Sequence, residues 1–183
     1  MTGKDHLLEG VRILDLSRVM SGPFCTAMLA DLGAEVIKIE MPGNGDDSRF
    51  FGPFVDGESA YFMLLNRGKK SLTLDLKSDE GKKILMAIVA ECDVVVENFR
   101  PGVAQRLGLD YETLKSENPA LIYASISGFG QGGPFADRPA YDLIVQAMSG
   151  LMHITGQRDG PPTAVGESAV SYTHLTLPTN REV

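Results

Sequence analysis

The feature that most constrains the fold is a strand, helix and strand pattern over residues 11–40. Two short apolar runs, VRILDLS (Val11–Ser17) and AEVIKIE (Ala34–Glu40), are rich in branched residues and are typical of buried strands. Between them, residues 22–33 carry apolar side chains at helical spacing, and Ser21 is the expected N-cap. The segment therefore predicts a βαβ unit with parallel strands and a right-handed crossover.

The rest of the sequence alternates strands and helices in the same way. Ser78 and Asp110 are each expected to cap a helix, and the Gly-, Pro- and Asp-rich residues 41–59 predict a long loop. The sum is an α/β fold, a Rossmann-like, open and mostly parallel sheet flanked by helices, with ligands bound at the carboxyl ends of the strands. Further strands are predicted at 70–76, 93–99 and 120–130, and further helices at 80–92, 100–108, 109–119 and 140–155.

Charge and cysteine content narrow the class of protein. The formal net charge of -7 argues against non-specific binding of nucleic acid, because phosphates are repelled overall. Cys25 and Cys92 are the two cysteines, a number that fits a reduced, cytoplasmic protein and provides no metal-binding spacing. The opening residues lack the apolar region of a signal peptide, and no apolar run is long enough for a membrane span. We therefore expect neither a metal site nor a membrane partner.

The segments that follow the predicted strands are the candidate ligand contacts. The start of the first helix offers backbone N–H groups to a pyrophosphate, although the GxGxxG of NAD-binding proteins is absent there. Phe99 offers an aromatic face to a base, and Arg100 offers a guanidinium to phosphate. The candidate segments are 18–23, 41–49, 98–106 and 128–138, and the candidate cations are Arg67, Lys69, Lys70, Lys77, Arg100 and Arg106.

Four stretches of the sequence carry a family resemblance over residues 8 to about 169: LEGVRILDLSRVMSGPFCTAMLADLGAEVIKIEMPGNGDDSR, NRGKKSLTLDLKSDEGK, DVVVENFRPGVAQRLGLDYETLKSENPALIYASISGFGQGGP and RPAYDLIVQAMSGLM. They resemble the class III CoA-transferases, the family of formyl-CoA transferase, the CaiB/BaiF group and alpha-methylacyl-CoA racemase. The resemblance implies a CoA-binding domain in an interlocked homodimer, with acyl-CoA as a substrate. It places the contacts with coenzyme A at Met20, Ser21, Met41, Leu74, Lys77, Asn98, Phe99, Arg100 and Arg106. Met41 departs from family members that have Arg there.

The resemblance also implies a reaction through a nucleophilic Asp, which forms a mixed anhydride and then an aspartyl-CoA thioester. That Asp is expected at position 171, where this sequence has Ser171, a weak nucleophile without an activating base. Residues 170–183 resemble translated sequencing-adapter sequence and are set aside from the fold. We therefore expect residues 1–169 to be the N-terminal part of the CoA-binding domain of a longer enzyme, and the chain itself to be inactive.

Two other functions stay open. An acyl-CoA racemase or lyase of the same family is one, although Tyr141 stands where the racemases have an acid/base His. His153 is a candidate base, but a lone His is more often structural. A nucleotide- or NAD-binding oxidoreductase domain is the other; Glu40 at the end of the second strand favours it, and the missing glycine motif opposes it. The donor and acceptor acids of a transferase do not follow from the sequence.

Overall fold

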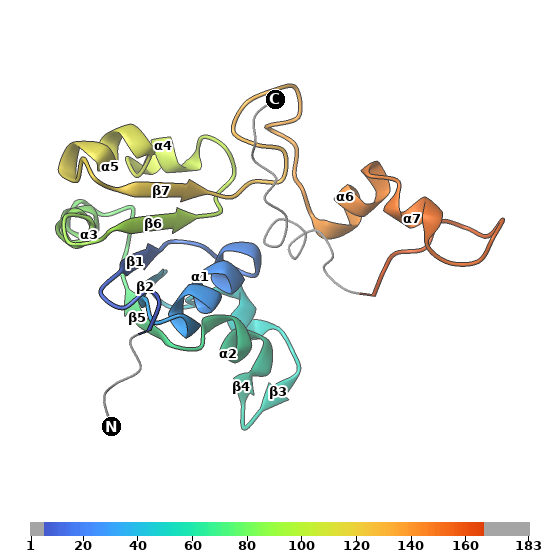
Figure 1. Ribbon diagram of the computed structural model, residues 1–183, viewed down its shortest axis with the longest axis horizontal. Helices are drawn as coiled ribbons and strands as arrows, with labels where there is room; N and C mark the ends of the chain where they lie inside the picture. Colours follow the sequence, from blue (N-terminus) through green and yellow to red (C-terminus); the bar gives the residue numbers. More distant parts are fainter. Residues whose placement is uncertain (1–5, 167–183) are drawn as a thin grey trace. The chain divides into compact units, whose positions relative to one another are not determined.

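The computed structural model describes residues 6–166, which divide into two units at residues 126 and 127 (Figure 1). A five-stranded sheet forms the centre of the first unit, in the order β5-β2-β1-β6-β7, and every neighbouring pair is parallel. In chain order this is third, second, first, fourth and fifth, the order of a Rossmann-type sheet. The strands are β1 (Arg12–Asp15), β2 (Glu35–Glu40), β5 (Lys69–Thr73), β6 (Val94–Glu97) and β7 (Ile122–Ser125). The predicted fold class is confirmed.

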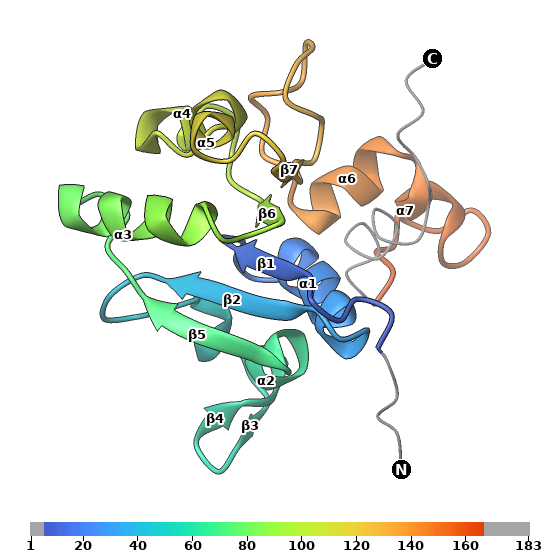
Figure 2. The same cartoon turned by 60° about the vertical axis from the view of Figure 1, so that its left-hand side comes forward.

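Helices cover both faces of this sheet. Adjacent residues of a strand point to opposite faces, and apolar side chains on each face pack against these helices. Leu14 packs with Leu85 on one face, and its neighbour Ile13 packs with Val36 and partly buried Leu29 on the other. Figure 2 shows α3 and α1 on these two sides of β1. The helices of the unit are α1 (Ser21–Asp31), α2 (Ala60–Asn66), α3 (Asp79–Val89), α4 (Val103–Leu107) and α5 (Tyr111–Glu117).

The predicted helix caps are confirmed at two positions and wrong at a third. Ser78 accepts a hydrogen bond from the Gly81 backbone N–H, and Asp110 accepts one from Thr113 N–H. Ser21 is instead the first residue of α1, which has no side-chain cap. Its hydroxyl accepts a hydrogen bond from Asn98 at 3.3 Å. The Ser21 side chain thus contacts the residue that follows β6 and caps no backbone group of α1.

The predicted loop over residues 41–59 contains short regular elements. A 3-10 helix covers Asp47–Phe50, and a two-stranded hairpin joins β3 (Phe54–Val55) to β4 (Glu58–Ser59). The following helix α2 was not predicted from the sequence. The edge strand β5 is also mostly exposed, because only β2 pairs with it, whereas the sequence predicts a half-buried strand.

The second unit contains α6 (Asp142–Met148) and α7 (Leu151–Ile154). The sequence predicts one helix over residues 140–155, and this prediction is wrong because Gly150 adopts a left-handed φ of 81° between the two helices. Tyr141 is the exposed N-cap residue of α6, and His153 lies in α7. Ser171 and the adapter-like segment lie outside the described residues. Within the described residues, no helix has the length and apolar character that crossing a membrane requires.

Candidate functional site

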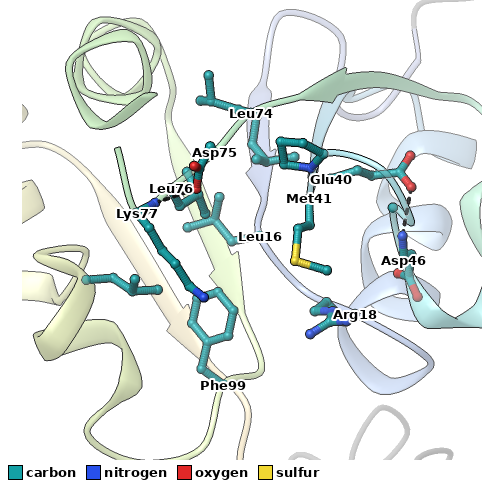
Figure 3. Close-up of a pocket in the computed structure, with 14 residues that line it drawn as sticks. Leu16, Arg18, Glu40, Met41, Asp46, Leu74, Asp75, Leu76, Lys77 and Phe99 are labelled. Carbon is teal, nitrogen blue, oxygen red and sulfur yellow. Dashed lines mark hydrogen bonds between the residues drawn. The ribbon is translucent and has the colours of Figure 1, made fainter. Parts of the chain in front are cut away.

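A pocket of about 360 Å³ lies at the carboxyl ends of the sheet strands (Figure 3). Its wall comes from the last two residues of β2, from the segments that follow β1, β2, β5 and β6, and from one residue of α4. This is the edge of a parallel sheet at which ligands bind, and the volume suits a small molecule or part of a larger one. The lining residues are Leu16, Arg18, Ile39, Glu40, Met41, Pro42, Gly45, Asp46, Leu74, Asp75, Leu76, Lys77, Phe99 and Leu107.

The pocket combines an apolar wall with two cationic side chains. Leu16, Leu74 and Phe99 supply apolar surface on which a flat ring can pack. Figure 3 shows Lys77 extending toward the Phe99 ring from one side, while Arg18 lies on the other side below Met41. Three carboxylates, Glu40, Asp46 and Asp75, also line the wall, and the first two are ion-paired with protein cations. The apolar face together with Arg18 and Lys77 suits a base linked to phosphate.

Four of the residues predicted from the sequence lie in the pocket wall: Met41, Leu74, Lys77 and Phe99. The other five are absent from that wall: Met20, Ser21, Asn98, Arg100 and Arg106. Arg100 and Arg106 are exposed. The predicted segments 18–23 and 41–49 contain Arg18 and Asp46, but neither residue was singled out as a contact, and Glu40 was considered only as a feature of a nucleotide-binding domain.

Asn98 contacts protein backbone rather than the pocket. Its Oδ1 accepts a hydrogen bond from the Arg18 N–H at 2.8 Å, and its Nδ2 donates to the Arg18 carbonyl at 2.7 Å. The same Nδ2 also donates to the Ser21 hydroxyl. The amide thus joins the end of β6 to the turn that follows β1.

Glu40, at the end of β2, is an ionised carboxylate inside the pocket wall. Both of its oxygens accept from the Arg49 guanidinium at 2.7 Å, and Ser71 and the Asp46 N–H add further hydrogen bonds. Burial raises the pKa of Glu40, but these hydrogen bonds outweigh burial and lower the pKa to about 2. Arg49 also lies 3.7 Å over the centroid of the Phe62 ring. The pair fixes the 41–59 segment to β2 and α2.

Two further ion pairs lie in the interior beside the pocket. Lys38 and Asp46 approach to 2.8 Å, and Lys69 and Asp15 to 2.9 Å, with all four side chains at most 1% exposed. Burial lowers the pKa of Lys69 to about 8, against the attraction of Asp15. Lys69 also donates to the Pro23 carbonyl and to Asn66. The Lys69 pair ties β1 and β5 to α1, and the Lys38 pair ties β2 to the 41–59 segment.

The Glu40 pKa leads to a pH-dependent stability. Because the pKa is lower in the folded chain, the stabilisation is present above the unfolded pKa of about 4.3 and is lost as the pH falls toward 2. We expect Glu40→Gln to be less stable than the parent chain at pH 7. Between pH 6 and pH 3, however, the free energy of unfolding of Glu40→Gln should fall by about 2 kcal/mol less than that of the parent chain. Urea unfolding at both pH values measures this difference.

Exposed Glu117 provides the control for this measurement. Glu117→Gln should show the same loss of stability between pH 6 and pH 3 as the parent chain. If Glu40→Gln and the parent chain lost equal stability on acidification, Glu40 would not have the lowered pKa on which the prediction depends.

Known proteins similar to this chain indicate its family. The sequence pattern of CoA-transferase family III matches residues 8–175. An acetyl-CoA:oxalate CoA-transferase of Acetobacter aceti is 56% identical over 163 residues, covering 89% of this chain and 42% of that protein. A succinyl-CoA:glutarate CoA-transferase of Mus musculus is 55% identical over 160 residues, covering 87% of this chain and 37% of that protein. The crystal structure of a CAIB/BAIF family protein from Brucella suis superposes with a TM-score of 0.86 at 45% identity, covering 92% of this chain and 46% of that one. The chain therefore spans less than half the length of these relatives.

Proposed function

The chain belongs to CoA-transferase family III, and from this premise we propose that it is the CoA-binding part of an enzyme that moves coenzyme A between an acyl-CoA and a carboxylic acid. The observation that carries the proposal is the pocket at the strand ends, with its apolar wall and two cations. The two relatives above are named for different acids, oxalate and glutarate. We therefore assign the reaction class without assigning the acid.

The proposed binding mode follows the chemistry of the pocket wall. Phe99 and Leu74 take the base of coenzyme A, because both present apolar surface to the pocket. Lys77 binds a phosphate group. Within the described part of the chain Lys77 forms no ion pair with a carboxylate, so its ammonium group is available to the ligand. The start of α1 at Met20 and Ser21 supplies backbone N–H groups to a second phosphate, and Arg100 and Arg106 extend the positive charge outside the wall.

The proposed reaction needs a carboxylate nucleophile. An Asp carboxylate attacks the thioester carbonyl, the C–S bond breaks, and a mixed anhydride and the CoA thiolate result. The thiolate then attacks the aspartyl carbonyl, which releases the first acid as a carboxylate and leaves an aspartyl-CoA thioester. The acceptor carboxylate attacks this thioester, and the same two steps in reverse give the new acyl-CoA and regenerate Asp. Water must be kept out, because it hydrolyses the anhydride.

We expect no transferase activity from the chain with the sequence given, because Ser171 occupies the position proposed for the nucleophile. A serine ester does not exchange with a carboxylate as an anhydride does. The purified chain is incubated with acetyl-, succinyl- or formyl-CoA and with oxalate or glutarate, and new thioesters are measured by liquid chromatography and mass spectrometry. The Acetobacter enzyme serves as the positive control. Turnover by the chain would contradict the role assigned to position 171.

Lys77→Ala tests the proposed binding site. We expect it to weaken coenzyme A binding about tenfold, because one hydrogen bond between charged groups contributes about 1.5–3 kcal/mol and each 1.4 kcal/mol is a factor of ten. Isothermal titration calorimetry measures the affinity, and exposed Lys83 on α3 provides the control variant Lys83→Ala. Arg106→Ala is expected to weaken binding as well. Equal affinity in the parent chain and Lys77→Ala would remove Lys77 from the site.

We also propose that the whole enzyme is a homodimer. The 41–59 segment and α2 expose large apolar side chains, among them Phe50 at 63%, Phe54 at 56% and Leu64 at 60%. Grouped apolar exposure of this kind supports a contact surface rather than a solvated one.

A further inference from the structure

The turn that follows β1 contains an unusual backbone conformation at the edge of the pocket. Val19 has a φ of 67°, in the left-handed region that branched residues avoid. Such a conformation is energetically unfavourable and persists only where surrounding contacts enforce it. Val19 is followed by the start of α1 and preceded by Arg18, a residue of the pocket wall.

Contacts from two other strand ends enforce this conformation. The Asp46 carboxylate, after β2, accepts the Val19 N–H at 3.1 and 3.3 Å. The Asn98 amide, after β6, accepts the Arg18 N–H at 2.8 Å and donates to the Arg18 carbonyl at 2.7 Å. The backbone groups on the N-terminal side of Val19 are therefore held by side chains from outside the turn.

The first of these contacts is itself held rigidly. Asp46 is 1% exposed, forms an ion pair with buried Lys38 at 2.8 Å and accepts from the Ser48 N–H and hydroxyl. Lys38 also donates to the Ser17 carbonyl at 2.9 Å. The oxygens of Asp46 are thus occupied by protein groups, which makes Asp46 an unsuitable ligand contact although it lines the pocket.

We propose that Asp46 and Asn98 are positioning residues that hold Val19 in the left-handed conformation and thereby present Arg18 and the start of α1 to an anionic group of coenzyme A. The coenzyme A part of this inference rests on the proposed function. It changes the role expected for Asn98, since both groups of its amide are engaged with Arg18 and Ser21. Arg18 becomes the second cation of the site, held beside the pocket by its 2.7 Å ion pair with Asp47.

Asn98→Ala combined with Val19→Gly tests the positioning role. Glycine adopts a positive φ without a Cβ penalty, so the turn should keep its shape in the Val19→Gly chain when the Asn98 contacts are removed. We expect Asn98→Ala to weaken coenzyme A binding at least tenfold in the parent chain and at most threefold in the Val19→Gly chain, as measured by calorimetry. An equal loss in both chains would show that Asn98 acts by direct contact and would overturn the proposal.

Asn118 provides the matched control, because its amide joins backbone groups in the same way. It accepts from the Ala120 N–H and donates to the Val89 and Cys92 carbonyls. It does not line the pocket. Asn118→Ala should leave coenzyme A affinity within twofold of the parent chain. Should Asn98→Ala fail to fold, Asn98→Asp keeps the size of the side chain and removes its donors.

A readout without ligand separates this proposal from the proposed function. The Val19 N–H is held by Asp46, so its hydrogen exchange in Asn98→Ala reports the shape of the turn rather than a lost partner. We expect NMR to show at least tenfold faster exchange at Val19 in Asn98→Ala and no change in Asn118→Ala. Unchanged exchange at Val19 would overturn the proposal. If the parent chain bound no coenzyme A, the proposed function would fail, and the exchange result would still decide the positioning role.

Discussion

Lys38→Met is expected to lower the free energy of unfolding by about 3–5 kcal/mol, the usual cost of breaking a buried ion pair from one side. The Lys38 ammonium and the Asp46 carboxylate are each 1% exposed and lie 2.8 Å apart. Methionine fills a similar volume but leaves the Asp46 charge buried without its cation. It also removes the hydrogen bond to the Ser17 carbonyl. Urea unfolding at pH 7 measures the loss.

The control for this variant is Lys70→Met on the neighbouring strand β5. Lys70 pairs with Glu35, but its side chain is 73% exposed, so water solvates both charges when the pair is broken. We expect this change to stay within about 0.5 kcal/mol of the parent chain. A loss for Lys38→Met no greater than that for Lys70→Met would mean that the buried pair does not stabilise the strand ends.

Gly81→Ala is expected to affect both stability and the pocket. A Cβ at Gly81, in the first turn of α3, would lie 1.9 Å from the Asp75 carbonyl oxygen, which is backbone and cannot rotate away. Forced overpacking of this kind costs about 1–3 kcal/mol or more, against a gain of about 1 kcal/mol in helix propensity. The turn that must move carries Leu76 and Lys77 into the pocket. We therefore expect a net loss of stability together with weaker coenzyme A binding.

Gly132→Ala is the matched control, because a Cβ there meets nothing within 4 Å. Thermal unfolding and calorimetric titration of both variants test the prediction. Gly132→Ala should leave both properties close to those of the parent chain. If Gly81→Ala bound coenzyme A as tightly as Gly132→Ala, the 75–78 turn would not shape the ligand site.

The parts of the fold that depend on local pattern could be predicted from the sequence. Branched apolar runs identified β1, β2 and β6, and the caps Ser78 and Asp110 follow from residue type and spacing alone. Helix α2 was missed because its sequence, AYFMLLN, lacks a clear helical period and follows a segment dominated by turn residues. The break at Gly150 was missed because the apolar spacing continues on both sides of the glycine.

The sequence indicated only part of the candidate site. The strand-end rule selected 18–23, 41–49 and 98–106, which contribute to the pocket wall, but also 128–138, which does not, and it left out residues 74–77, which do. Phe99 and Lys77, which the family resemblance assigns to coenzyme A, both lie in the wall. The roles of Asp46 and Asn98 depend on which backbone groups of other strands lie opposite them, and that information exists only in the folded chain. Arg18 lies in the predicted segment 18–23, but nothing in the sequence distinguishes it from its neighbours as a residue of the wall.

The proposed function requires that coenzyme A binds in the pocket at the strand ends. An NMR titration of the ¹⁵N-labelled chain with coenzyme A tests this. We expect saturable shifts at Met41, at Leu74 to Lys77 and at Phe99, with no change along α5 (Tyr111–Glu117). Absence of shifts at millimolar coenzyme A, or saturable shifts confined to residues outside the pocket wall, would contradict the proposed function.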